Sequence, residues 1–235
     1  MAIRWTQEAL ALHQAGRLAD AESLYLKSLA ADKDFYPALH LMGVIRLCQG
    51  RLAEALSYIE RALTIRPGAP ETLSNYGIAL QGVGRYEDAL DALERVVALS
   101  PEDSRAWSNR GALLSKLHRN DEALADLDRA VALDPVYVDA MNNRGLTLMA
   151  LLRPEEALES YDRVLQIRPD YVEAQYGRGL ALNATGRASD ALGEFDRVLQ
   201  AKPDHVHALV NRATVLSAMG EVDLALQSYD RALTI

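Results

Sequence analysis

Four asparagines stand at positions separated by multiples of one spacing. Asn75, Asn109 and Asn143 are each 34 residues apart, and Asn211 follows 68 residues after the third. A side-chain amide both donates and accepts hydrogen bonds, as the backbone of an extended peptide does. Regularly spaced amides could therefore bind a peptide backbone with little selection among its side chains. The simpler alternative is that asparagine is only a small, solvated residue at these positions.

Side chains that could catalyse a reaction or bind a metal form no recognisable set. His205 and His207 have no cysteine beside them, so we expect two exposed polar residues there and no metal site. Cys48 has no histidine close in sequence, which favours a half-buried thiol over a nucleophile. Asp126 and Asp128 would point to different faces of a helix. We therefore predict no catalytic residues, no metal and no cofactor.

The spacing of the asparagines belongs to a 34-residue repeat that runs through the chain. Such a repeat decides the fold and must be found first. Five prolines mark its boundaries: Pro67, Pro101, Pro135, Pro169 and Pro203. Alanine occupies the twentieth position of all seven copies: Ala21, Ala55, Ala89, Ala123, Ala157, Ala191 and Ala225. We predict one array over 1–235, with units 2–35, 36–69, 70–103, 104–137, 138–171, 172–205 and 206–235, the last truncated.

Each unit has the pattern of two helices. Trp107, Gly111 and Leu114 recur every three or four residues, as one face of a helix requires. A glycine often follows, which suits the left-handed conformation at a helix C-terminus, although His118 and Leu152 replace it in two units. The boundary proline then ends the second helix. Small residues at the eighth and twentieth positions are expected to let the two helices approach closely.

Charges recur at the predicted turn between the two helices. Arginines follow the first helix, and acidic residues occupy the first turn of the second: Arg17, Arg51, Arg85, Arg119, Arg153 and Arg187, then Asp20, Glu54, Asp88, Glu122, Glu156 and Asp190. Each sign complements the dipole of the nearer helix, at about 0.3–1 kcal/mol per charge. We therefore interpret these charges as structural.

These features resemble the tetratricopeptide repeat (TPR) family, whose unit has 34 residues. The matches include Trp5 and Trp107 at the fourth position, the glycines from Gly43 to Gly179 at the eighth, and the alanines at the twentieth. Aromatic residues at the twenty-fourth position add to them: Tyr25, Tyr161, Phe195 and Tyr229. The resemblance covers essentially the whole chain. It implies an all-α, right-handed superhelical solenoid of about seven helix-turn-helix repeats, with an extended concave surface.

In TPR proteins the first helix of each unit lines the concave side. The resemblance thus places the asparagines in a peptide-binding groove, together with other polar residues of those helices: Ser74, Ser108, Asn142, Tyr176, Gln81, Asn183, Arg105 and Lys116. The row of Asn75, Asn109 and Asn143 is similar to the asparagine ladder in the TPR arm of O-linked N-acetylglucosamine transferases. Gly177 interrupts the row before Asn211.

Arginine follows the ladder position in the last four units: Arg110, Arg144, Arg178 and Arg212. These side chains could contact an acidic ligand. We favour the other interpretation, in which each arginine packs its stem on a neighbouring helix and leaves its head in water.

Composition narrows the classes of partner. A formal net charge of −8 and a pI near 5.2 argue against nucleic acid or an anionic membrane as the main partner. The sequence has no apolar run of about 18 residues and no apolar signal-peptide core at its start. We expect a cytoplasmic protein with a protein or peptide ligand.

The predicted function is a protein–protein interaction module that binds a peptide segment of a partner in its concave groove. Two alternatives stay open, because no polar capping helix follows Ile235. One is the substrate-binding arm of a larger enzyme, such as a glycosyltransferase, with its catalytic domain absent. The other is a scaffold that forms homo-oligomers through its uncapped ends.

Overall fold

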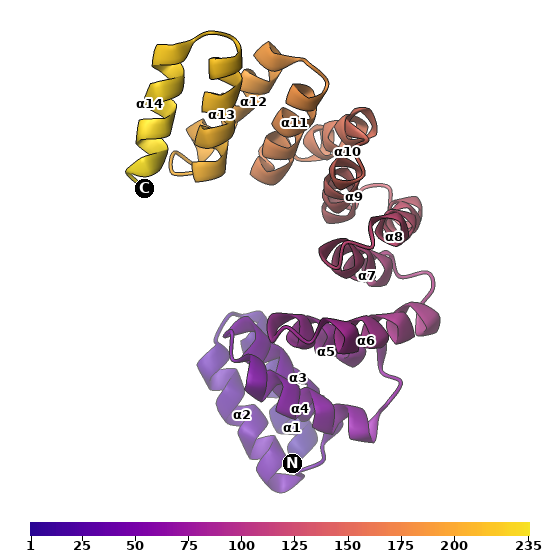
Figure 1. Cartoon of the computed structure of the whole chain (residues 1–235). Coiled ribbons are helices and arrows are strands. Elements are labelled where there is room, and N and C mark those ends of the chain that lie inside the picture. The colour runs from indigo at the N-terminus through magenta and orange to yellow at the C-terminus, as the bar shows by residue number, and fades with distance from the viewer. The chain divides into compact units, whose positions relative to one another are not determined.

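A computed structural model describes all 235 residues and contains fourteen α-helices and no strand (Figure 1). Taken two at a time, the helices reproduce the seven predicted repeats, which confirms the all-α TPR-type fold. Their bounds are α1 (Ala2–Gln14), α2 (Leu18–Ala31), α3 (Tyr36–Cys48), α4 (Leu52–Ile65), α5 (Pro70–Gly82), α6 (Tyr86–Leu99), α7 (Ser104–Lys116), α8 (Asn120–Leu133), α9 (Val138–Ala150), α10 (Pro154–Ile167), α11 (Val172–Ala184), α12 (Ala188–Ala201), α13 (Val206–Ala218) and α14 (Val222–Leu233).

The chain divides into two compact units, Met1–Leu113 and Leu114–Ile235. The first contains α1 to α6 and most of α7, and the second contains the end of α7 and α8 to α14. That all seven repeats form one continuous array stays a prediction. None of the helices is both long and apolar enough to cross a membrane.

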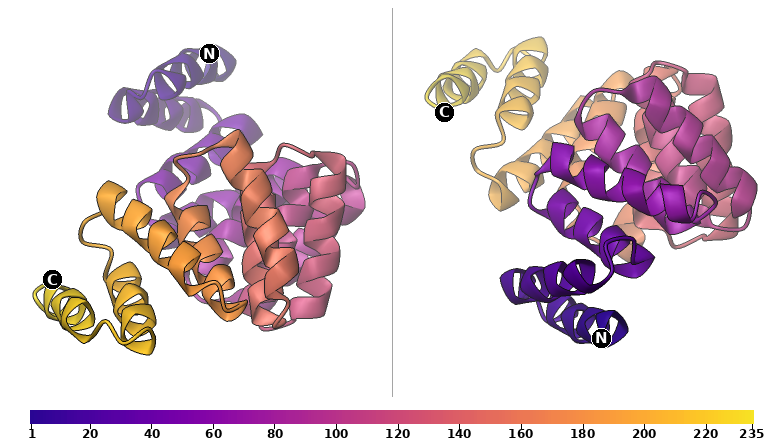
Figure 2. Two further views of the ribbon diagram at one scale, coloured as in Figure 1. Left: turned by 90° about the horizontal axis from the view of Figure 1, so that it is seen from above. Right: turned by 90° about the horizontal axis from the view of Figure 1, so that it is seen from below.

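Within each unit the first helices of successive pairs contact one another. α1 packs against α3 and α3 against α5, and in the second unit α9 packs against α11 and α11 against α13. Five second helices, α2, α4, α8, α10 and α12, also pack against the first helix of the following pair, and Figure 2 gives two further views of the ribbon. Because the first helices are the closer set, they line the inner side of each unit.

The turn inside each pair has a left-handed residue. Gly16 has a φ of 76°, and the amide of Arg17 donates to the carbonyl of Leu12 at 2.9 Å, which closes the C-terminus of α1. His118 and Leu152, which occupy the position of the turn glycine in two pairs, adopt the same conformation, with φ values of 60° and 58°. Side chains with a Cβ are strained in this region, so these two turns carry a cost that the glycine turns avoid.

The recurrent turn charges pair with each other. In all six turns that carry an arginine, it contacts the acid three residues later, as in Arg17–Asp20 at 2.6 Å and Arg153–Glu156 at 2.6 Å. The sequence pattern indicated only helix-dipole interactions for these charges, and the pairing was not predicted. Both partners are exposed, so each pair contributes little to stability.

The small positions allow close helix packing, as predicted. A Cβ on Gly43 would lie 2.5 Å from Cγ1 of Ile59, and one on Gly145 would lie 2.7 Å from the ring of Tyr161. Tyr161 and the alanines of the twentieth position are buried. Any larger residue at these positions would separate the two helices of a pair.

Candidate functional site

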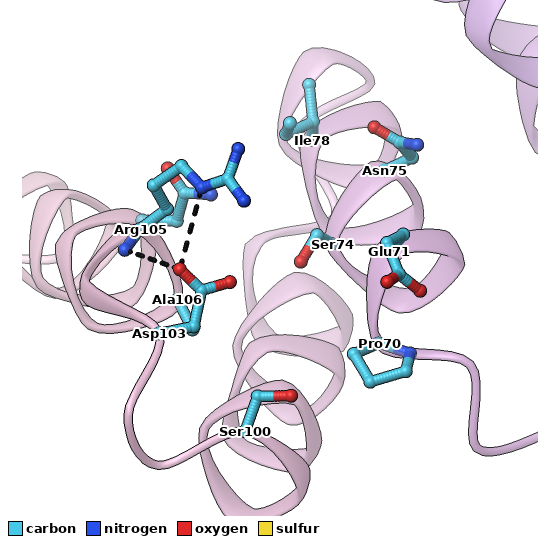
Figure 3. Close-up of a pocket in the computed structure, with 10 residues that line it drawn as sticks. Pro70, Glu71, Ser74, Asn75, Ile78, Ser100, Asp103, Arg105 and Ala106 are labelled. Carbon is cyan, nitrogen blue, oxygen red and sulfur yellow. Dashed lines mark hydrogen bonds and ion pairs between the residues drawn. The ribbon is translucent and has the colours of Figure 1, made fainter.

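One stripe of α5, which contains three polar residues and one isoleucine, faces the inner side of the first unit. Glu71, Ser74, Asn75 and Ile78 are spaced by three and four residues, so they share a face of the helix. They line a cavity of about 260 Å³ together with residues from α7 and the turn before it (Figure 3). The full lining is Pro70, Glu71, Ser74, Asn75, Ile78, Ser100, Asp103, Arg105, Ala106 and Asn109. The predicted ladder residues Asn75 and Asn109 thus meet in one cavity.

Most polar side chains of this cavity have no hydrogen-bond partner within the protein. This holds for Ser74, Asn75, Ser100, Asn109 and the Glu71 carboxylate. Such groups have their full hydrogen-bonding capacity available for a ligand or for water.

Asp103 uses only one of its two carboxylate oxygens for contacts within the protein. Its Oδ1 accepts from the backbone amide of Arg105 at 3.0 Å and lies 3.5 Å from the Arg105 Nε, as the dashed lines in Figure 3 show. Its second oxygen has no such contact and faces the side of the cavity where Ser74 lies. Asp103 and Ser100 were not among the predicted site residues, because they lie in a turn outside the first-helix pattern.

In the second unit the ladder residues differ in what they contact. The Asn143 amide is half-buried and has no partner within the protein. The Asn211 amide nitrogen donates to the Tyr176 hydroxyl at 2.9 Å and to the His207 carbonyl at 2.8 Å. Asn142 is buried, and its Oδ1 has no partner. Only Asn143 therefore has a fully available amide at the ladder position of this unit.

Tyr176 belongs to a small aromatic cluster with His205 and Phe195. Its ring centroid lies 5.0 Å from that of His205 and 6.1 Å from that of Phe195. Burial raises the pKa of the Tyr176 hydroxyl. His205 Nδ1 also accepts from the amide of Ala208 at 3.1 Å and so caps α13. The expectation that His205 is an exposed polar residue is therefore wrong, whereas His207 is exposed.

The break in the asparagine row has a packing cause. A Cβ on Gly177 would lie 2.4 Å from Cζ of Tyr161 and 2.7 Å from its hydroxyl oxygen. Tyr161 is fully buried, its hydroxyl has no partner, and burial raises its pKa. An asparagine at position 177 would collide with this ring, so glycine is the residue that fits there without displacing Tyr161.

The arginines beside the ladder tie successive repeats together. Nε of Arg144, Arg178 and Arg212 lies 2.6 Å from the aspartate 16 residues earlier, which is on the second helix of the preceding pair: Asp128, Asp162 and Asp196. Their Nη1 atoms reach the second helix of their own pair, at Ser160, Glu194 and Ser228. Our expectation that the heads stay in water is wrong, because each guanidinium bridges two helices.

The remaining predicted groove residues are dispersed. Arg110 places its guanidinium 5.1 Å from the Trp107 ring centroid. Ser108 is buried, Gln81 is half-buried, and Lys116 and Asn183 are exposed. The Cys48 thiol is exposed, contrary to the half-buried position that we expected, because α3 ends at this residue. No three His, Cys, Asp or Glu side chains are close enough together to hold a metal ion.

Comparison with known families gives a clear result. Tetratricopeptide repeat models match residues 77–137, 113–172, 142–206 and 176–235, and two further models of the same repeat match 34–102 and 5–26. The chain therefore belongs to the tetratricopeptide repeat family. A search of curated proteins finds no significant match.

Solved structures with a similar fold are numerous. A tetratricopeptide repeat protein from Parabacteroides merdae has a TM-score of 0.78 at 20% identity, over 99% of this chain and 92% of that one. MamA has a TM-score of 0.62 at 25% identity, over 72% and 92% of the two chains. YrrB, described as a TPR protein with an unusual peptide-binding site, has a TM-score of 0.63 at 24% identity, over 79% and 95%. The similarity of the asparagine row to that of glycosyltransferase TPR arms stays a prediction.

Proposed function

We propose that this chain binds a peptide segment of a partner protein along the inner side of its first helices. The observation that carries the proposal is that Asn75 and Asn109 line one cavity with no intramolecular hydrogen bond. Each amide offers a donor and an acceptor, which suits a peptide group of an extended ligand. Asn143 has the same availability, and Asn211 retains its carbonyl oxygen as an acceptor.

The experiment compares partner capture by the wild type and by the triple variant Asn75→Ala/Asn109→Ala/Asn143→Ala. Captured proteins are identified by mass spectrometry, and the bound segment is then synthesised and titrated by fluorescence anisotropy. Three lost hydrogen bonds at about 0.5–1.5 kcal/mol each correspond to a loss of affinity of at least about tenfold. Circular dichroism checks that the variant keeps its helices.

A matched control removes three exposed amides from second helices, through Gln166→Ala, Gln200→Ala and Gln227→Ala. This control is expected to bind the segment as the wild type does. Equal affinity for the wild type and the asparagine variant would contradict the proposal. The alternative of a substrate-binding arm of an enzyme would use the same groove, so the same variants test its binding step.

Self-association by end-to-end stacking is disfavoured by charge. In the second unit, each junction between pairs joins an arginine to an aspartate, as in Arg212–Asp196 at 2.6 Å. At the last helix the corresponding aspartate is Asp230, whereas the first helix has Glu8 at the corresponding arginine position. Stacking α14 of one copy on α1 of another would oppose these two carboxylates. Light scattering is expected to give a monomer mass at rising protein concentration, and a dimer mass would contradict this reasoning.

A further inference from the structure

The cavity between α5 and α7 is rich in hydrogen-bond acceptors. Glu71 contributes an exposed carboxylate with no hydrogen bond or ion pair, although its charge also acts on His40, and Asp103 contributes one free carboxylate oxygen. The hydroxyls of Ser74 and Ser100 can also accept hydrogen bonds. The carboxylates outnumber the single cation of the lining, Arg105, which is exposed and already lies beside Asp103. A ligand group with several donors and a positive charge would complement this set.

The wall beside these acceptors is apolar. Ile78 is 45% exposed and lies on the same stripe of α5 as Glu71, and Pro70 and Ala106 complete the apolar part of the lining (Figure 3). A long basic side chain has this same division, since its methylenes pack on apolar surface while its charged head stays polar. The volume of about 260 Å³ is sufficient for one such side chain.

We propose that this cavity is a specificity subsite for a lysine or arginine side chain of the bound peptide. The inference rests on the proposed function, because the same peptide backbone must be held by Asn75 and Asn109. In this arrangement the ammonium or guanidinium donates to the Glu71 carboxylate and the free oxygen of Asp103. The hydrocarbon stem packs on Ile78.

Two other ligand types fit the cavity less well. An anion could approach the N-terminus of α7, but Asp103 already occupies that position and accepts from the Arg105 amide. A metal ion would need further protein ligands, and no group of three His, Cys, Asp or Glu residues that could hold one is present. The acceptors are therefore best matched by a protonated side chain.

The test is a selection from a phage-displayed library of random peptides on three forms of the full chain. These are the wild type, the double variant Glu71→Gln/Asp103→Asn, and the control Glu94→Gln. The double variant removes both charges at nearly unchanged shape, and asparagine at position 103 can still cap α7. Glu94 is an exposed glutamate on α6, outside the cavity. Circular dichroism verifies that all three forms are folded.

Wild type and Glu94→Gln are expected to enrich peptides with lysine or arginine at one fixed position, and the double variant is expected to lose that preference. A selected peptide is then titrated together with a version in which glutamine replaces the basic residue. This replacement should weaken binding to the wild type about ten- to hundredfold, the range for hydrogen bonds to charged groups. It should change binding to the double variant little.

The remaining outcomes separate the two proposals. Peptides that need Asn75 and Asn109 but show no fixed basic residue would overturn the subsite and leave the proposed function intact. Equal enrichment of basic residues by the double variant would also overturn the subsite. If no selected peptide depends on Asn75 and Asn109, the proposed function fails and the subsite fails with it.

Discussion

Replacing Gly177 by alanine tests whether the buried Tyr161 ring sets the break in the asparagine row. The new Cβ would lie 2.4 Å from Cζ of Tyr161, which is closer than such atoms approach in proteins. Tyr161 cannot retreat easily, because its ring also contacts Gly145 and is fully buried. Overpacking of this kind costs about 1–3 kcal/mol. The higher helix propensity of alanine returns about 0.5–1 kcal/mol.

The net expected destabilisation is about 1–2 kcal/mol, by combining these two terms. For a chain of this size it corresponds to a fall in unfolding temperature of roughly 2–8 °C. Thermal unfolding followed by circular dichroism measures it. The matched control is Gly193→Ala on α12, where a Cβ meets nothing within 4 Å. That control should unfold at a slightly higher temperature than the wild type, since it gains propensity alone.

A double variant isolates the contact itself. Tyr161→Leu removes the ring, so adding Gly177→Ala to it should cost less than adding Gly177→Ala to the wild type. The difference is the coupling energy, and neighbours in contact typically give about 0.5–3 kcal/mol. If Gly177→Ala unfolds no earlier than Gly193→Ala, or if the coupling is zero, the packing explanation is refuted.

Three further predictions concern strain, a buried charge and pH. Leu152→Gly should raise the unfolding temperature, because the exposed leucine has a φ of 58° and its left-handed conformation costs about 1–2 kcal/mol; an unchanged midpoint would argue against strain there. Arg178→Ala should lower the free energy of unfolding by about 3 kcal/mol in urea, since the buried Glu194 carboxylate loses one of its two arginine partners. The equivalent arginines Arg144 and Arg212 contact serines instead, so a smaller loss for Arg178→Ala than for their alanine variants would contradict this prediction. The hydrogen bonds from buried Arg46 hold the pKa of Glu22 below its usual value of about 4.3. The ionised Glu22 carboxylate therefore stabilises the folded state above that pH, and this stabilisation is lost as the pH falls through the lowered pKa. Acid unfolding curves of wild type and Glu22→Gln should therefore converge at low pH, and parallel curves would disprove the linkage.

Local periodicity made the helices predictable, and the resemblance to TPR proteins indicated which side of them faces inward. The 34-residue repeat marked the seven helix pairs, and the resemblance to TPR proteins placed Ser74 and Asn75 on the inner side of α5. The helical faces follow from residues three or four positions apart, whereas the helix pairs were recognised from a spacing of 34 residues. The left-handed turn at Leu152 was likewise marked by its register with the turn glycines.

Local periodicity does not predict contacts between helices, although a repeated 16-residue spacing in the sequence coincides with some of them. Arg144 follows Asp128 by 16 residues, and the same spacing joins the next two arginines to their aspartates. Without knowledge of helix packing, that spacing has no structural meaning. The structure shows that it connects the inner helix of one pair to the outer helix of the pair before it.

The sequence by itself determined the repeat, the helix pairs and the stripe that holds the asparagines, because backbone geometry within one helix follows from nearby residues. Only the tertiary structure decided which of those amides are available. Asn75 is free in a cavity that also contains Asp103, whereas Asn211 donates to Tyr176, 35 residues earlier. Availability depends on which side chains distant in sequence are brought within hydrogen-bond distance, and packing of the helices against one another sets that.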